Sequence, residues 1–517
     1  MPRPQIVLFA TTLEDRIPED HPVRLIDEIL DRLDWTDWEL EYDSGHGQPP
    51  IHPKVLSKVL LFAMIRGIRS SRKIEYALHH SIDFMWLASG HTIDHSTLSN
   101  FRTKHPERLR DIYQQMVRYA VSLGVAKLSE LCLDGTRTRA DASRHRTWKA
   151  NDVEKLIAEL NREFQERLSQ MKSADTIDDL FDDGQAADKL PPDLADMQAR
   201  REELDAILRQ LRDMETDRRT QQNIDPKKNP AQLPKADLDA RVLPNKEGGY
   251  APNYTPTVVT ETTGGFIVDA DVLIGNVEHL TLTTMVDTVA EDYGVDIDAM
   301  LADTAFSTGA NITGMEERDV ELLSPLNEVV CENNPAERPD PTEPVAEEDR
   351  GRLPINPQTK RFDKSAFVYD ETNDCYYCPA GKTLHRSDTE TKQRASGPVK
   401  TTNYRCGDCT GCPLAEFCRK DVNAKSGRKV SRDEHAAARA RHRDHMRDPA
   451  VKERYAKRLH FGETPFAVLK ACFGLRRFLV RGHEKVQMEW LWGCTAFNLK
   501  KLMAMAESAT KSEPAVS

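Results

Sequence analysis

Apolar residues of segment 1–125 recur at helical spacing. They repeat every three or four residues in two runs, 23–33 and 55–63. Breaks follow at Gly67 and at Ser89-Gly90, and Asp94 or Ser96 is placed to cap the next helix. Short helices separated by small turns, with Arg, Ser and Thr near their starts, are typical of helix-turn-helix DNA-binding domains. An ordinary helical bundle with a basic surface would show the same spacing.

The pattern changes to strands after residue 125. β-branched and apolar runs predict strands at 128–133, 255–260, 266–274, 299–302 and 320–326. The turn Thr262-Thr263-Gly264-Gly265 joins two of these into a hairpin, and helical spacing returns over 280–293. This order predicts an α+β fold in which helices flank a mixed sheet.

Three further segments interrupt or follow this sheet. Residues 151–216 contain two charged amphipathic helices around an acidic turn at 178–192, which predicts an antiparallel helical hairpin. We interpret this hairpin as a solvated insert without chemistry. Residues 329–440 are polar and rich in cysteine, helix returns from about residue 434 to 503, and the tail 506–517 is predicted to be disordered.

The charge of the chain is unevenly distributed. The 517 residues correspond to about three domains of roughly 150 residues each, and the net charge is −12. Residues 51–110 carry 10 Lys/Arg against 4 Asp/Glu, residues 419–458 carry 14 against 6, and residues 151–216 carry 9 against 18. A nucleic-acid partner needs only a local cationic face, so the acidic total does not exclude DNA. No run approaches the ~18 apolar residues of a membrane span, which predicts a cytoplasmic protein.

Two aspartates follow short apolar strands. Asp134 precedes Gly-Thr, and Asp303 precedes Thr-Ala-Phe. Carboxylates at the ends of adjacent strands can share Mg²⁺ or Mn²⁺, which prefer oxygen ligands. A third acid would come from the late helical segment, where the candidates are Glu453, Glu463, Glu484 and Glu489. Lys470 lies two helical turns after Glu463, so these two side chains would share one face.

Six of the ten cysteines fall between residues 375 and 418. They form Cys-x₂-Cys, a gap, and then Cys-x₂-Cys-x₂-Cys-x₅-Cys, at Cys375, Cys378, Cys406, Cys409, Cys412 and Cys418. Paired thiolates of this spacing match tetrahedral Zn²⁺. An iron–sulfur cluster and plain reduced thiols are the alternatives, and six candidates exceed the four positions of a zinc site.

These motifs together resemble the DDE-type insertion-sequence transposases. The resemblance rests on 48–102, Leu-Cys-Leu-Asp134-Gly-Thr, 250–269, Leu-Ala-Asp303-Thr-Ala-Phe and 458–502, in that order along the chain. It implies an RNase H-like catalytic core in which Asp134, Asp303 and Glu463 hold two Mg²⁺ or Mn²⁺ ions. Tyr455, Arg458, Glu463 and Lys470 resemble the family's Tyr-Arg-Glu-Lys signature, although four residues separate Arg458 from Glu463 where three are commoner.

The resemblance also implies a domain plan. Residues 1–125 would bind DNA, 126–328 with 441–505 would form the catalytic domain, and 329–440 would be a small zinc-ribbon-like insertion. The expected DNA-binding residues are Arg69, Arg72, Lys73, Arg102, Lys104, Tyr455, Arg458 and Lys470, with the basic stretch 439–443 gripping backbone. The resemblance favours zinc at Cys378, Cys409, Cys412 and Cys418, with Cys375 and Cys406 as alternatives.

The function expected from this resemblance is cleavage of element ends and strand transfer into target DNA. The protein would act as a homo-oligomer on DNA, associated with a bacterial nucleoid. A nuclease that only hydrolyses would use the same three acids. A non-catalytic DNA-binding protein descended from a transposase is the alternative from a different class.

Overall fold

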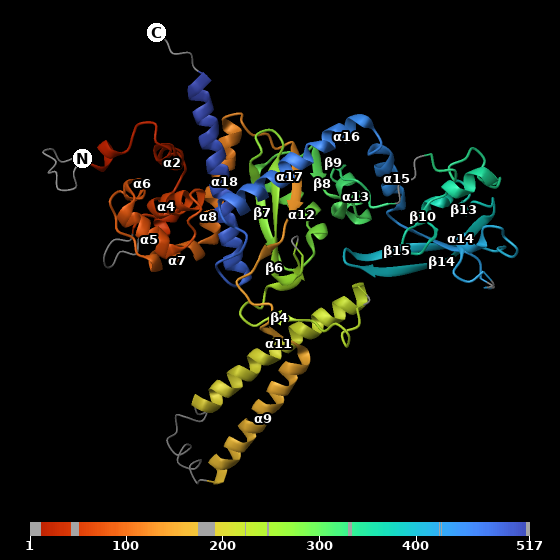
Figure 1. Ribbon diagram of the computed structural model, residues 1–517, viewed down its shortest axis with the longest axis horizontal. Helices are drawn as coiled ribbons and strands as arrows, with labels where there is room; N and C mark the ends of the chain where they lie inside the picture. The colour runs from red at the N-terminus through yellow and green to blue at the C-terminus, as the bar shows by residue number, and fades with distance from the viewer. Residues whose placement is uncertain are drawn as a thin grey trace. The chain divides into compact units, whose positions relative to one another are not determined.

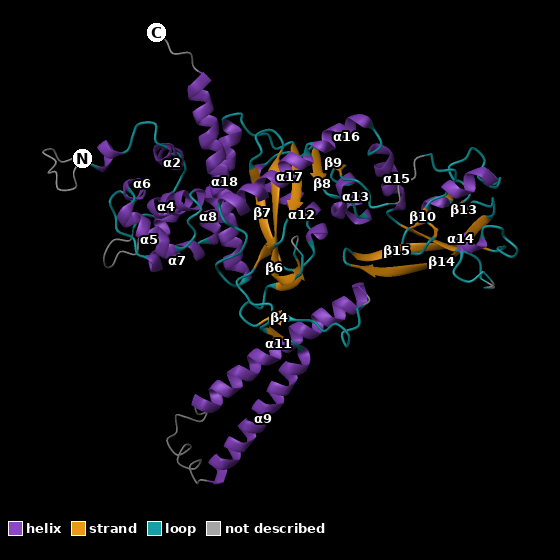
Figure 2. Ribbon diagram, viewed as in Figure 1, coloured by secondary structure: helices purple, strands orange, loops and turns teal. Residues whose placement is uncertain are grey.

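The computed structural model describes residues 12–42, 51–173, 192–222, 224–245, 248–328, 333–422, 424 and 426–512. The chain divides into two compact units. The first consists of Met1–Glu278, Thr284–Ile297 and Lys457–Ser517, and the second of His279–Thr283 and Asp298–Ala456. Helices and strands occur in both units, as Figure 2 shows, so the α+β class expected from the sequence is confirmed.

The sheet of the first unit is built around the long strand β6 (Tyr250–Glu261). β1 (Glu130–Gly135) and β2 (Thr138–Arg139) pair with β6 on one side, and β7 (Ile267–Leu273) and β5 (Arg241–Pro244) pair with it on the other, all antiparallel. The predicted β6–β7 hairpin is confirmed. Its turn is stabilised by the buried Glu261 carboxylate, which accepts hydrogen bonds from the backbone N–H groups of Thr263, Gly264 and Phe266.

The N-terminal helices share a core with the C-terminal helix. They are α1 (Leu13–Arg16), α2 (Pro22–Asp31), α3 (Thr36–Tyr42), α4 (Pro53–Ile65), α5 (Ser71–His80), α6 (Ile82–Leu87), α7 (His95–Thr103) and α8 (Pro106–Ser122). The long helix α18 (His483–Ser512) packs against α2, α4, α7, α8 and β7, and Figure 1 shows it beside α8 and β7. Segment 1–125 therefore packs its apolar faces onto residues about 400 positions later.

Helix α18 corrects one expectation from the sequence. It continues through residues 506–512, which were predicted to be disordered, and residues 513–517 lie outside the described residues. The apolar repeat of residues 23–30 is confirmed, because Val23, Ile26, Ile29 and Leu30 are all buried in α2. Asp94 is the N-cap of α7, and its carboxylate accepts hydrogen bonds from the backbone N–H groups of Ser96 and Thr97.

The charged insert forms the predicted helical hairpin. Helices α9 (Ala150–Ser173) and α11 (Pro192–Gln222) pack together, and β3 (Thr147–Trp148) pairs with β4 (Leu233–Pro234) at their base. Trp148, Val153, Leu204 and Leu211 form part of a small core there. The predicted turn at 178–192 lies almost entirely outside the described residues. Helix α12 (Leu282–Tyr293) follows the β6–β7 hairpin, at the position expected from the sequence.

The second unit contains a parallel strand pair and a separate antiparallel sheet. β8 (Ala299–Ala302) pairs in parallel with β9 (Glu321–Leu323), and α13 (Gly309–Glu316), α15 (Ala436–His445) and α16 (Pro449–Ala456) accompany them. The antiparallel sheet consists of β12 (Val368–Asp370), β13 (Cys375–Tyr377), β14 (Thr383–Arg394), β15 (Gly397–Cys406) and β16 (Lys429–Asp433). The cysteine-rich segment is organised around this second sheet.

Candidate functional site

Asp134 is a buried carboxylate near the end of β1. Its backbone pairs with Val258 of β6, so the strand position of the side chain is fixed by the sheet. One carboxylate oxygen, Oδ1, accepts a hydrogen bond from the Gly135 N–H at 2.8 Å and lies 3.2 Å from a guanidinium nitrogen of Arg458. The Asp134 carboxylate therefore forms an ion pair with a cationic side chain of α17.

Helix α17 (Arg458–Ala467) lies against β1 and approaches Asp134 closely. A Cβ added at Gly462 would lie 3.0 Å from Oδ2 of Asp134, which is tighter than an ordinary contact. The absence of a side chain at Gly462 thus permits the approach. Glu463 is the next residue on α17 and is exposed. A glycine inside a helix is unfavourable, so its presence before Glu463 was a signal in the sequence that this position needs space. The hydrophobic periodicity used in the sequence analysis does not detect such a signal.

Lys470 reaches the loop that follows Asp134. It lies in a π-helical turn, η5 (Val468–Cys472), and its Nζ donates to Thr136 Oγ1 at 2.6 Å and to the Arg137 carbonyl at 2.7 Å. Single π-helical turns inside longer helices occur frequently at functional sites. The first unit therefore brings Asp134, Arg458 and Lys470 to one edge of its sheet, with Glu463 on the same helix as Arg458.

Two further predicted site residues, Asp303 and Tyr455, belong to the second unit. Asp303 follows β8 and caps the short helix η2 (Thr304–Phe306), because its Oδ1 accepts from the Ala305 N–H at 2.7 Å. Its backbone carbonyl accepts from Ser324 Oγ at 2.7 Å, which ties the end of β8 to the segment after β9. Tyr455 lies on α16 and is half-buried.

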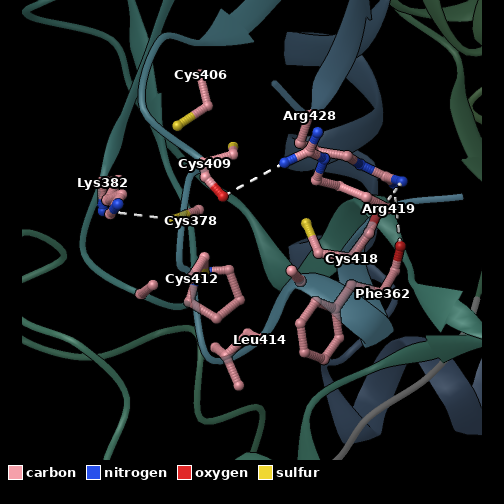
Figure 3. Close-up of a pocket in the computed structure, with 13 residues that line it drawn as sticks. Phe362, Cys378, Lys382, Cys406, Cys409, Cys412, Leu414, Cys418, Arg419 and Arg428 are labelled. Carbon is pink, nitrogen blue, oxygen red and sulfur yellow. Dashed lines mark hydrogen bonds between the residues drawn. The ribbon is translucent and has the colours of Figure 1, made fainter. Parts of the chain in front are cut away.

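Five cysteines line a small cavity of about 20 Å³ in the second unit: Cys378, Cys406, Cys409, Cys412 and Cys418 (Figure 3). None of them forms a disulfide. Cys375, the first residue of β13, does not line the cavity, whereas Cys378 directly follows this strand and does. Among the described residues, no three His, Cys, Asp or Glu side chains are arranged as a ready-made metal site.

The turn 378–382 presents the Cys378 sulfur to a backbone donor. The Lys382 N–H points at Sγ of Cys378 at 3.3 Å, and Gly381 supplies the left-handed backbone, φ +76°, that this turn requires. Burial raises the pKa of the Cys378 thiol, and it raises the pKa of Cys418 to about 12. These thiols are therefore protonated at neutral pH unless a bound cation stabilises the thiolates.

Two family models match the chain. One, described as Transposase DDE domain, matches residues 377–503, and the other, described as Transposase domain (DUF772), matches residues 11–104. Both matches are to transposase families and support an insertion-sequence DDE transposase. The DDE match implies an enzyme of the transposase class. The DDE match includes Arg458, Glu463 and Lys470, whereas Asp134 and Asp303 lie outside both matched ranges.

A search of curated proteins finds no match to the chain. Within the described part of the chain, no helix has the length and apolar character needed to cross a membrane.

Two of the predicted DNA contacts are buried. Arg69 Nη2 lies 2.8 Å from Oε1 of Glu489, and the two side chains are 8% and 1% exposed. The Arg102 guanidinium, also buried, donates to the Arg69 carbonyl at 2.7 Å. These contacts argue against a DNA-binding role for Arg69 and Arg102, and they give Glu489, one of the four candidate third acids, a structural partner. Arg72, Lys73 and Lys104 are exposed.

The basic stretch 439–443 is occupied by ion pairs within the second unit. Arg439 contacts Asp433, Arg441 contacts Glu316 and Arg443 contacts Glu328, at 2.6–2.7 Å. These carboxylates offset part of the positive charge that was expected to contact DNA. Arg441 and Arg443 are 63% and 40% exposed, so the grip of this stretch on backbone phosphates stays a prediction.

Proposed function

We propose that the protein cleaves DNA at the ends of its element and joins them to target DNA. The observation that carries the proposal is the contact of α17 with β1. The Asp134 carboxylate contacts Arg458 and lies against Gly462, and Lys470 contacts the following loop. Glu463 is the residue after Gly462 on α17. One buried acid, one exposed acid and two cations suit a phosphate substrate that also requires metal. The RNase H-like description of this core is part of the proposal.

Asp134, Asp303 and Glu463 would hold two Mg²⁺ or Mn²⁺ ions. Carboxylate oxygens are the donors that these hard cations prefer. When bound, such ions activate a water or a DNA 3′-hydroxyl and stabilise the leaving oxygen. Lys470 and Arg458 would hold the phosphate in place, and Arg72, Lys73 and Lys104 would contact the duplex from the N-terminal helices. Two copies of the chain would act on the two element ends.

The test of this function is a cleavage and joining assay with the full-length protein, Mn²⁺ or Mg²⁺, and labelled duplexes from the element's flanks. Asp134→Asn, Asp303→Asn and Glu463→Gln should each abolish cleavage while DNA binding persists. Glu453→Gln and Glu484→Gln are matched controls, since both acids are exposed, and they should leave cleavage unchanged.

Each other outcome of that assay contradicts a stated part of the proposal. Cleavage that survives in one of the three variants removes that residue from the metal site. Cleavage without joined products indicates a nuclease that only hydrolyses. A wild-type protein that binds these duplexes but never cuts them indicates a non-catalytic DNA-binding protein.

We also propose that four of the five clustered thiols hold a structural Zn²⁺. The favoured ligands are Cys378, Cys409, Cys412 and Cys418, and Cys406 is the alternative that also lines the cavity. The N–H directed at the Cys378 sulfur supports the proposal, since metal-bound thiolates are commonly held by such donors.

Elemental analysis should find about one zinc per chain, lost in Cys378→Ser and kept in Cys472→Ser, whose thiol is exposed and outside the cluster. Iron in place of zinc would indicate a cluster, and a metal-free protein would indicate reduced thiols.

A further inference from the structure

Arginines that are distant in sequence gather on one surface of the first unit. The segment 476–478 runs beside Arg139, at the end of β2, with an isolated parallel bridge between Arg139 and Arg477. The Arg139 N–H donates to the Arg476 carbonyl at 3.3 Å, and the Phe478 N–H donates to the Arg139 carbonyl at 2.8 Å. Phe478 is fully buried and anchors the segment. We call Arg139, Arg476, Arg477 and Arg481 the arginine cluster.

The arginine cluster is open to solvent. Arg477 and Arg481 are each 55% exposed, and Arg139 and Arg476 are also exposed. Asp141 contacts both Arg477 and Arg481, the latter at 2.9 Å. Asp237 and Asp239 also lie nearby, where they accept from the backbone N–H groups of Gly482 and His483.

Ion pairs at an exposed surface contribute only about 0–1 kcal/mol each. Asp141 can therefore orient the guanidinium groups of Arg477 and Arg481 while leaving them available to another anion at little cost.

One member of the cluster, Arg139, lies close to Asp134 along the chain. Arg139 is five residues after Asp134, so their Cα atoms are at most about 18 Å apart. Between them, Thr136 and Arg137 contact Lys470. B-DNA advances ~3.4 Å per base pair, so about 18 Å corresponds to roughly five base pairs. A duplex with one phosphate at Asp134 can therefore place further phosphates on the cluster.

We propose that the arginine cluster binds the backbone phosphates of the duplex that is cut at Asp134, within about five base pairs of the cut. The inference rests on the proposed function for the position of the cut. It also supplies an exposed cationic surface in the first unit, where Arg69 and Arg102 are buried. Arginine forks suit phosphate oxygens in two-pronged contacts, and such contacts fix the register of DNA without reading its sequence.

The test measures duplex binding by the full-length protein at several salt concentrations, with fluorescence anisotropy as the readout. Arg476→Gln, Arg477→Gln and Arg481→Gln should each lower the slope of log K against log [salt] by about 0.9 per lost phosphate contact, and the triple variant should lower it most. Arg200→Gln/Arg201→Gln is the matched control, because these arginines are 46% and 55% exposed on α11. Its slope should equal that of the wild type.

Two readouts guard against a folding defect. Each variant should melt at the wild-type temperature, and the Arg→Lys versions should keep the salt slope because they keep the charge. Hydroxyl-radical footprinting should show protected sugars on the side of the cut that the triple variant leaves unprotected. A wild-type slope and footprint in the triple variant would overturn the inference, and so would tighter binding of single-stranded than of duplex DNA through the cluster.

The outcomes for the cluster and for catalysis are separable. If Asp134→Asn loses cleavage while the cluster variants bind DNA like the wild type, only the cluster inference fails. If the wild type never cleaves DNA but the cluster variants lose salt-dependent binding, the proposed catalysis fails and the cluster is a duplex-binding surface.

Discussion

The buried Arg69–Glu489 pair offers a sharp test of what a basic residue in the N-terminal helices does. Arg69 lies in the turn before α5, and Glu489 lies on α18. Besides Arg69, the Glu489 carboxylate accepts from the Leu479 N–H at 2.8 Å, and Arg69 also donates to the Gly474 carbonyl. The pair thus joins the N-terminal helices to the C-terminal helix inside the core.

Arg69→Met removes one side of this pair and leaves the Glu489 carboxylate buried with a single close backbone donor. Breaking a buried ion pair from one side costs about 3–5 kcal/mol. Total stabilities of about 5–15 kcal/mol make that a large fraction. Glu489→Gln keeps an acceptor for the Leu479 N–H and removes the charge. The double variant Arg69→Met/Glu489→Gln should therefore be less destabilised than the sum of the single variants, by at least about 1 kcal/mol.

Urea unfolding followed by tryptophan fluorescence measures this cost, because Trp490 and Trp492 are buried on α18 beside the pair. Under conditions where it is folded, Arg69→Met should bind DNA with the wild-type slope of log K against log [salt]. Arg72→Met is the matched control, since Arg72 is exposed on the adjacent helix. It should change the free energy of unfolding by no more than about 0.5 kcal/mol and reduce the slope of log K against log [salt] for DNA binding. An Arg69→Met protein with a wild-type midpoint and a reduced slope would refute the structural role.

Three further substitutions test close contacts and a buried acid. Gly462→Ala should lower the cleavage rate about tenfold or more with little change in melting temperature, because its Cβ would lie 3.0 Å from Oδ2 of Asp134. Gly264→Ala should destabilise the protein by about 1–3 kcal/mol in urea, because its Cβ would lie 2.2 Å from the Val125 carbonyl oxygen. Burial raises the pKa of Asp269 from 3.8 to about 6, so the folded state binds this proton more tightly than the unfolded state and stability falls as the pH rises through that window. Asp269→Asn should remove this component, up to about 3 kcal/mol, from a series of urea curves measured at different pH values.

Local patterns in the sequence were sufficient for much of the secondary structure. The apolar repeat of α2, the Asp94 cap of α7, the β6–β7 hairpin and the α9–α11 hairpin all follow from periodicity and turn chemistry. These features depend on neighbours within a few residues, so the sequence determines them without knowledge of the fold. Helix α18 was expected to end earlier, because the polar composition of residues 506–512 gave no support for a helix that the structure continues to Ser512.

The candidate site was predictable in part. Strand ends predicted Asp134 and Asp303, and the family resemblance selected Glu463 from four candidate acids. The structure brings Lys470, two helical turns after Glu463, to the loop after Asp134. Gly462 was missed, because its role is to leave space for a side chain on another element.

The sequence by itself determined which residues carry charge, and only the tertiary structure decided which of those charges face solvent. Arg69 and Arg102 belong to a basic segment, yet packing buries Arg69 against Glu489 and Arg102 against the Arg69 carbonyl. Arg139 and Arg477 are more than 300 residues apart, yet backbone pairing makes them neighbours. Electrostatic energy depends on distance and on the surrounding dielectric, and both are set by long-range packing. A count along the chain contains neither quantity.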